Sequence, residues 1–209
     1  YFWNKLNFNM IPTFVGNTMK NIFFLFAIVF FMSCGNEPMP KPKAFLRLEY
    51  PKPQYKEVST NLPFTFEKNS ITNDIGVIKS SRNKKTLGLD VTYPTIKATI
   101  FLTYKKIDAN NLQLLINDAQ NITQSHARKA DAIAGQLFAN LEQRVYGMFY
   151  EVDGNVASQA QFYVTDSITH FLTGSLYFYV KPNYDSILPA ADYLKKDIQH
   201  IMETLKWEE

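Results

Sequence analysis

Hydrophobic and polar positions along this chain repeat with two different periods. Where they alternate every second residue, the pattern indicates a β-strand, because successive side chains of a strand point to opposite faces of a sheet. This alternation predicts shorter strands at 44–50, 64–67, 74–80, 87–93 and 97–105. Three longer stretches predict strands at 144–152, 156–165 and 169–180, the first two joined by a tight turn at 153–155. The stretch 130–138 carries few large apolar groups, and we predict a short strand there as well.

Two other stretches repeat every three to four residues, which places apolar side chains along one side of a helix. The first predicted helix covers 111–129, with Asp108 or Asn110 as its N-cap. The second covers 187–207, and Pro189 suits its first turn because a proline there gives up no helical hydrogen bond. The order along the chain is therefore strands, a helix, further strands and a final helix.

This order of elements predicts the fold class. Neighbouring strands joined by short turns pair antiparallel. An amphipathic helix buries its apolar side against a sheet or another helix. We therefore expect an α+β fold in which a mostly antiparallel sheet packs with the two main helices. On element order alone, this arrangement is similar to the Mog1/PsbP-like sandwich.

One apolar run, at 22–32, follows neither period. It carries no charge, comes after a single cation at Lys20, and is too short to cross a bilayer, which takes about 20 residues of helix. Such a run is typical of the hydrophobic part of an export signal. Ser33, Cys34 and Gly35 come next and resemble the lipobox of bacterial lipoproteins, in which the cysteine is acylated and the chain is cut before it. The alternative is a chance cysteine at the end of a buried core helix.

The lipobox interpretation divides the chain into four parts. Residues 1–18 begin with a tyrosine and are expected to precede the true start, residues 19–33 form the signal peptide, residues 34–43 form a lipidated, proline-rich tether, and residues 44–209 form a single α+β domain. Cys34 is then the lipid attachment site, with palmitate as an expected acyl group. Removing the first 33 of the 209 residues leaves 176, enough for one domain with a sizeable core.

Charge and cysteine content exclude several classes of protein. Lys5 and Lys20 precede Cys34, so the rest of the chain has 20 of the 22 basic residues against 19 acidic ones. A nucleic-acid-binding protein normally carries a strongly basic surface, so we expect no nucleic acid partner. Cys34 is the only cysteine and the three histidines lack ligand spacing, so we expect neither a disulfide within the chain nor a metal site. The sequence has no glycine-rich phosphate loop, and we expect no cofactor.

Asp166, Ser167 and His170 are the residue types of a hydrolytic triad and lie close together in the sequence. The serine lacks the G-x-S-x-G context of a nucleophile elbow, and Asp and Ser also favour turns by bonding the nearby backbone. We therefore predict a turn between two strands and no enzyme activity. Together with Asn183 and Asp185, these three residues form the candidate partner surface. Two alternatives stay open: a periplasmic module that binds a small ligand or lipid in an enclosed apolar pocket, and an envelope hydrolase that uses these residues.

Several segments, taken in order, resemble one known family. They lie at 40–51, 63–67, 98–105, 126–130, 161–167, 170–172, 174–178 and 182–186, and the densest are QFYVTDS, GSLYF and PNYDS. Together they are similar to GldD, the gliding-motility lipoproteins of Bacteroidetes. The resemblance implies a non-enzymatic envelope lipoprotein that supports gliding motility and the linked type IX secretion machinery, and it assigns a role to Cys34 alone. The expected partners are the membrane, through the lipid, and other gliding and secretion proteins of the envelope; the expected location is the outer membrane, facing the periplasm.

Overall fold

The computed structural model describes residues 49–58, 62–73, 75, 79–80, 86–108, 110–180 and 183–208. Cys34, the predicted signal peptide and tether, and most of the strand predicted at 44–50 lie outside the described residues. Residues Phe45–Glu209 belong to one compact unit, and every described helix and strand lies within it. In the described part of the chain, neither helix is long and apolar enough to cross a membrane.

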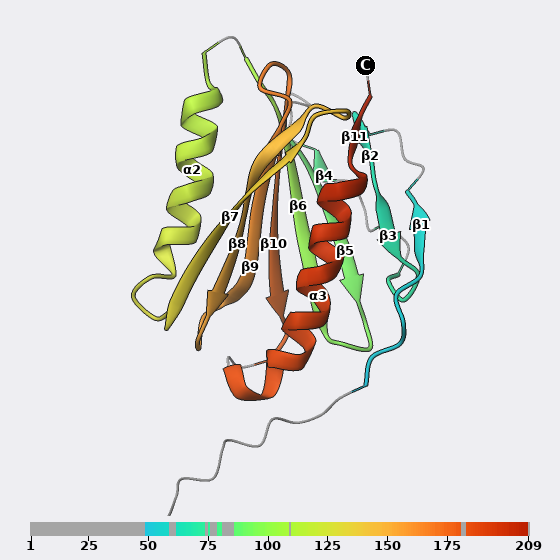
Figure 1. The fold of residues 1–209 in the computed structure, drawn as a ribbon, viewed down its shortest axis with the longest axis vertical. Helices are drawn as coiled ribbons and strands as arrows, with labels where there is room; N and C mark the ends of the chain where they lie inside the picture. The colour runs from blue at the N-terminus through green and yellow to red at the C-terminus, as the bar shows by residue number, and fades with distance from the viewer. Residues whose placement is uncertain are drawn as a thin grey trace, which may run out of the picture. The chain divides into compact units, whose positions relative to one another are not determined.

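The unit is built around an antiparallel sheet with seven described strands (Figure 1). In sheet order they are β4 (Lys79–Ser80), β5 (Thr86–Tyr93), β6 (Ala98–Lys106), β10 (His170–Phe178), β9 (Ser158–Thr165), β8 (Val145–Asp153) and β7 (Ala132–Asn140). From β7 to β10 each strand pairs with the next, and β10 then lies beside β6. Short turns at 141–144 and 166–169 reverse the chain, which is why these neighbours run antiparallel.

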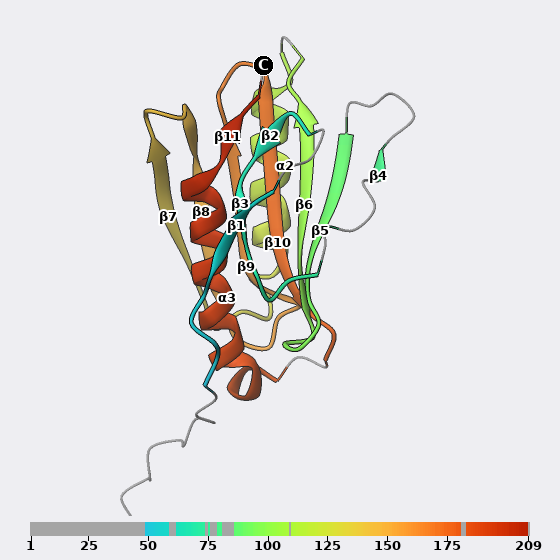
Figure 2. The same cartoon turned by 90° about the vertical axis from the view of Figure 1, so that its right-hand side faces the viewer.

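Two helices, α2 (Leu112–Ser125) and α3 (Tyr184–Thr204), cover opposite faces of this sheet (Figures 1 and 2). The alternation along β10 shows how the faces are divided. Phe171 packs in a cluster with Leu115 of α2, whereas the next residue, Leu172, belongs to the core beneath α3. The predicted α+β fold, a mostly antiparallel sheet packed with two main helices, is confirmed.

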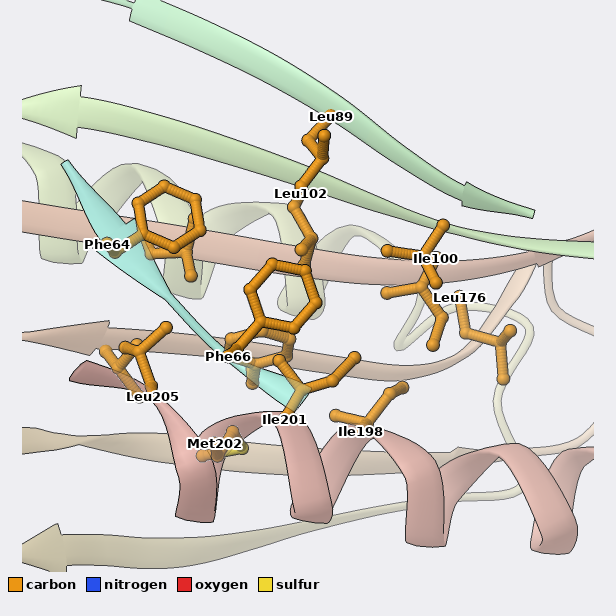
Figure 3. Close-up of a cluster of buried hydrophobic side chains, with 14 of the residues drawn as sticks. Phe64, Phe66, Leu89, Ile100, Leu102, Leu176, Ile198, Ile201, Met202 and Leu205 are labelled. Carbon is orange, nitrogen blue, oxygen red and sulfur yellow. The ribbon is translucent and has the colours of Figure 1, made fainter. Parts of the chain in front are cut away.

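The larger core lies between the sheet and α3 (Figure 3). Phe64 and Phe66 reach it from near the start of the described chain and Ile198 reaches it from α3; each is at most 1% exposed. Burying one such side chain stabilises the fold by roughly 1.5–3 kcal/mol. Gly174 of β10 leaves room in this core for the ring of Phe162 on β9, because a Cβ on the glycine would lie 2.0 Å from the ring's Cε1.

The start of the described chain packs against the same core as a narrow ribbon. This N-terminal ribbon comprises β1 (Tyr55–Glu57), β2 (Phe64–Thr65) and β3 (Glu67–Asn69). β1 pairs with β3, and β2 pairs with β11 (Lys206–Trp207), the last described strand. A strand near the start of the described chain therefore pairs with its last described strand.

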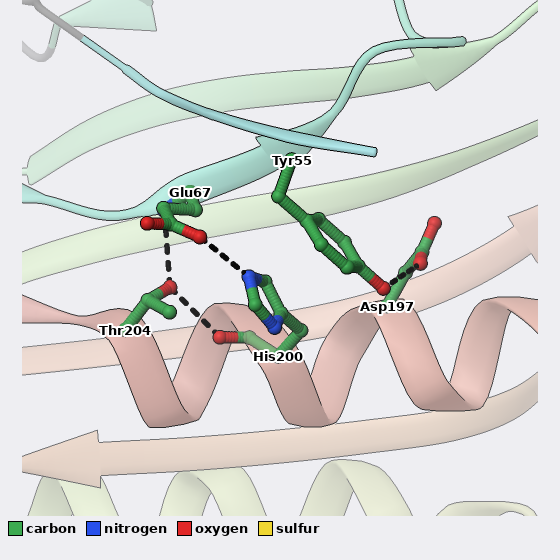
Figure 4. Close-up of polar contacts among 5 residues, drawn as sticks. All are labelled: Tyr55, Glu67, Asp197, His200 and Thr204. Atoms are coloured by element: carbon green, nitrogen blue, oxygen red, sulfur yellow. Dashed lines mark hydrogen bonds and ion pairs between the residues drawn. The ribbon is translucent and has the colours of Figure 1, made fainter. Parts of the chain in front are cut away.

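Polar contacts fasten the N-terminal ribbon to α3 (Figure 4). The Tyr55 hydroxyl donates to Asp197 Oδ1 at 2.7 Å, and the Tyr55 ring stacks on His200 with centroids 3.5 Å apart. His200 Nε2 lies 2.8 Å from Glu67 Oε2, and the Glu67 N–H donates to Thr204 Oγ1 at 3.0 Å. Because Asp197 is only 1% exposed, its carboxylate depends on protein donors such as the Tyr55 hydroxyl in place of water.

Further contacts hold the residues just before the ribbon. The ring of Tyr50 stacks on Tyr193 of α3 with centroids 5.0 Å apart, and the Tyr193 hydroxyl donates to the carbonyl of Pro51 at 3.0 Å. Asn69 Nδ2 donates both to Asp197 Oδ2 and to the Tyr193 hydroxyl, each at 2.9 Å. Both views place the first described residues toward the end of the sheet at which α3 begins (Figures 1 and 2).

Several strand boundaries differ from the prediction. The alternation at 64–67 predicted one strand, but Phe66 interrupts it, and β2 and β3 pair with different partners. Tyr50 lies in no strand, and the first strand begins at Tyr55. The predicted strand at 74–80 is described as a strand only at Lys79–Ser80, while 74 and 76–78 lie outside the described residues.

The helix ends also differ from the prediction. The N-cap of α2 is Asn111, not Asp108 or Asn110, and its side chain accepts the Asp108 N–H at 3.0 Å instead of capping the helix. α3 begins at Tyr184, three residues before the predicted start, so Pro189 lies inside the helix beyond its first turn. The helix ends before Leu205, whose backbone is extended, and Trp207 therefore lies in β11.

Candidate functional site

A cleft of about 790 Å³ lies at the end of the sheet where β10 begins. Its lining comes from six separate parts of the chain, four of which carry its charged and aromatic side chains. β6 contributes Tyr104 and Lys106, the β7–β8 turn contributes Arg144, the β9–β10 turn contributes Asp166 and His170, and β11 contributes Trp207. The cleft therefore combines aromatic rings with charges of both signs.

Asp166 builds the β9–β10 turn. Its Oδ1 accepts the backbone N–H groups of Ile168, Thr169 and His170 at 3.0, 2.8 and 2.8 Å. Thr165 Oγ1 adds a second local bond by accepting the Ser167 N–H at 2.9 Å. Short polar side chains that bond the following backbone are what fix such a turn, and the turn predicted here from the sequence is present.

Two opposing effects act on the carboxyl of Asp166. Burial raises its pKa, but the three backbone donors from His170, Ile168 and Thr169, together with the nearby His170 ring, outweigh burial and lower the pKa below its ordinary value. The group is therefore ionised at neutral pH. Asp166 gives this end of the cleft a fixed negative charge.

His170 is held by aromatic neighbours. Its Nδ1 lies 2.9 Å from the Tyr104 hydroxyl, and its ring stacks on Trp207 with centroids 5.0 Å apart and planes inclined by 9°. Burial lowers the pKa of His170; Asp166 opposes this and Lys106 adds to it, so the ring is neutral at pH 7. Burial, followed by the charge of Asp166, raises the pKa of Tyr104. His170 and its ring neighbours therefore present a neutral aromatic surface beside the Asp166 carboxylate.

This geometry does not assemble a catalytic triad. Ser167 is exposed and has a φ of 69°, and the Nδ1 of His170 is engaged by Tyr104. Within the described residues, no hydrogen bond joins Ser167 to His170, and Asp166 Oδ1 is occupied by backbone donors. An activated serine needs a base within hydrogen-bonding reach. In the described geometry, His170 is therefore not placed to activate Ser167.

The five residues of the candidate partner surface lie at two ends of the sheet. Asp166, Ser167 and His170 lie together beside the cleft. Asn183 is the N-cap of α3 and Asp185 lies in its first turn, both beyond the far end of β10. Nine residues of strand span about 30 Å, so the two groups do not form one cluster.

The sequence did not single out Tyr104 or Trp207 as site residues. Tyr104 reaches His170 only through the pairing of β6 with β10, and Trp207 reaches it only because β11 leaves the line of α3. Both contacts join residues far apart in the chain, and no local pattern indicates them. Of the histidines, His126 has a pKa lowered by burial and His200 contacts Glu67. The part of the chain that the structure describes holds no group of three His, Cys, Asp or Glu side chains suited to a metal ion.

Comparison with known proteins assigns the chain to a family. A family model described as gliding motility lipoprotein GldD matches residues 35–207. No curated protein matches the chain, and no solved structure matches it. The matched range begins directly after Cys34 and ends at Trp207, so it includes every side chain of the cleft named above.

Proposed function

The chain belongs to the gliding motility lipoprotein GldD family, and on this basis we propose that it is a non-enzymatic envelope lipoprotein that supports gliding motility and the linked type IX secretion machinery. The family match over residues 35–207 is the observation that carries the proposal. The role is one of binding: the domain joins other gliding and secretion proteins of the envelope while its lipid holds it on the membrane.

The anchor in this proposal is an acyl group on Cys34. The start of the family match at residue 35 supports it, because a lipoprotein signal is cut just before the acylated cysteine. A single acyl chain gives only marginal membrane binding, so two or more chains on this cysteine are needed for stable attachment. The proposed location is the outer membrane, with the domain in the periplasm. Cys34→Ser should move the protein from the membrane fraction to the soluble fraction and reduce spreading of cells.

The proposed contact surface is the cleft with its β9–β10 turn. The open, mixed lining of Tyr104, His170 and Trp207 beside Lys106 and Asp166 suits a polypeptide segment, which offers both apolar and charged groups. A lipid tail would require an enclosed apolar pocket, and this cleft is lined by charged groups. A small polar ligand is the second candidate, favoured by a volume within the range of small-molecule sites. The hydrolase alternative gains no support from the geometry of Ser167.

Affinity capture from envelopes tests the proposal. The lipidated wild-type protein, captured from detergent-solubilised envelopes, should recover components of the gliding and secretion machinery, and deletion of the gene should reduce both spreading and secretion. Lys106→Glu, in the cleft, should lower that recovery, whereas Lys129→Glu, at another exposed position after α2, should not. Normal spreading and secretion after deletion would refute the proposal.

A further inference from the structure

The strand β7 forms one edge of the main sheet (Figures 1 and 2). In the described part of the chain it pairs with β8 alone. It is nine residues long, Ala132–Asn140, and the side turned away from β8 presents a row of backbone donors and acceptors. Such an edge can accept a further strand by ordinary main-chain hydrogen bonds.

β7 lacks the features that usually protect an edge. It contains no charged residue and no proline, and it is exposed along most of its length. Leu137, within the strand, and Leu141, just after it, are each 77% exposed. The opposite edge is formed by β4, which has only two described residues and is a poor template for pairing. Among the described strands, β7 is therefore the one that forms a long, uncharged edge.

From the sequence of this edge we propose that β7 pairs antiparallel with β7 of a second copy of this chain, joining the two sheets around a two-fold axis at Gln136. In this register, the numbers of the two residues in each pair add up to 272. The resulting pairs are Ile133 with Ala139, Ala134 with Phe138, and Gly135 with Leu137. Every large side chain meets a small one, and the two Gln136 amides meet each other on the axis.

Neighbouring registers lack this fit. Moving the axis to Leu137 places the two copies of Leu137 opposite each other and leaves Gly135 opposite Ala139, a crowded pair beside an empty one. Moving it to Gly135 pairs Gly135 with itself and sets Ile133 against Leu137. Directly opposed side chains in an antiparallel pair lie close together, so matched sizes fill the space between them. The match between large and small side chains therefore favours a second β7 as the pairing strand and favours this register.

The faces and charges of the two copies also agree. Residues directly opposite each other in an antiparallel pair point to the same face of the sheet. The proposed register pairs odd-numbered residues with odd-numbered ones and even with even, so each pair lies on one face. Gly135 faces Tyr150 and Met148, on the α2 side, whereas Phe138 packs on the core beneath α3. The α2 side of one sheet therefore continues into the α2 side of the other copy, and the two α3 sides are continuous in the same way. Asp131 would meet Leu141, so no like charges oppose each other at the ends.

This pairing is independent of the role proposed above and adds a self-association to it. A nine-residue edge buries little area, so the contact needs a high local concentration. Copies anchored on one membrane provide such a concentration without any further contact. The experiment therefore uses the full chain in its own membrane.

Oxidative cross-linking of single-cysteine variants tests the register. In Gln136→Cys the two new thiols lie on the axis, where opposed Cα atoms are about 4.5–5.5 Å apart, within the range of a disulfide. Oxidised envelopes should then give a dimer band that a reductant removes. Ala132→Cys is the matched control on the same strand and face: its two copies are separated by eight residues of strand, roughly 27 Å, and should give no such band. The parent chain controls for Cys34.

A second variant tests the contact without a new thiol. In the Gln136→Cys background, Leu137→Lys places a charge in the contact and should abolish the dimer band, while Leu114→Lys, at a 60% exposed position on α2, should leave it. Circular dichroism of each purified variant verifies folding. A folded Gln136→Cys protein that gives no dimer overturns the proposal, as does equal cross-linking of Ala132→Cys. Cross-linking of Gln136→Cys to a different protein also overturns it, because the edge then receives another chain.

Discussion

Gly174→Ala introduces one methyl group at the place that the ring of Phe162 now occupies. The added Cβ would lie 2.0, 2.6 and 2.7 Å from three atoms of that ring, whereas carbon atoms pack at about 3.5–4.0 Å. Phe162 is 3% exposed and belongs to the core beneath α3, so its ring has to displace other buried side chains. The substitution should therefore behave as overpacking of a filled core.

The expected cost follows from two opposing contributions. Overpacking destabilises a core by about 1–3 kcal/mol. Replacing glycine by alanine lowers the conformational entropy of the unfolded chain, which stabilises the folded state by about 0.4–1 kcal/mol. We therefore expect Gly174→Ala to lower the free energy of unfolding by about 1–2 kcal/mol, and the melting temperature by roughly 2–4 °C for each kcal/mol.

Urea denaturation followed by circular dichroism measures this cost. Gly135→Ala, on the exposed edge strand β7, is the matched control. Its Cβ would lie 3.1 Å from the ring of Tyr150 on the neighbouring strand β8, which is close enough to need only a small shift of that ring. The substitution should therefore change stability by less than about 0.5 kcal/mol. Adding Phe162→Leu removes the obstructing ring, so the double variant should lose less than the two single losses combined, by about 1 kcal/mol. Additive losses, or equal stability of the two alanine variants, would show that the ring does not determine the cost.

Three further predictions concern polar groups. Asp166→Ala leaves three backbone N–H groups without their acceptor and should cost about 1–3 kcal/mol at pH 7. Because the folded pKa of Asp166 lies below its ordinary 3.8, this stabilisation is present above pH 3.8 and is lost as the pH falls through the folded pKa, so urea denaturation curves of variant and wild type should converge in acid. The folded pKa of His170 also lies below its ordinary 6.5, so the stability that neutral His170 contributes is present above pH 6.5 and declines below it. NMR should show a titration midpoint of His170 below 6.5. His170→Phe should weaken the pH dependence of stability below pH 6.5. Asp197→Ala removes the buried acceptor of both Tyr55 and Asn69 and should lower thermal stability more than Tyr55→Phe, which removes a single hydrogen bond. Equal losses would contradict the importance of the buried carboxylate.

The sequence predicted the sheet and helices well wherever a period extended over many residues. The three long strands were each found to within about two residues, because alternation continues through each of them. The end of α3 was missed because its apolar period continues to Leu205 with no glycine or proline to stop it. β1 was missed because three residues between prolines and polar positions carry no period.

The candidate site was predicted in part. Asp166 and Ser167 indicated a turn by their residue types alone, since the bonds that make it are local. Asn183 and Asp185 were grouped with them because they are near in sequence, but β10 carries the chain to the other end of the sheet before α3 begins. The aromatic surface of Tyr104, His170 and Trp207 depends on strand pairing between distant segments, which a single sequence does not reveal.

The attachment of the N-terminal ribbon determines how the domain would bear a mechanical load. Tension on its amino end would act first on the stack of Tyr50 with Tyr193 and the bond from Tyr193 to Pro51, and next on the bond from Tyr55 to Asp197. All three contacts end on α3, so the pull passes into this helix before it reaches the sheet. β1 and the residues before it can peel away first, while β2 stays paired with β11, so the cleft at the other end of the sheet keeps its shape.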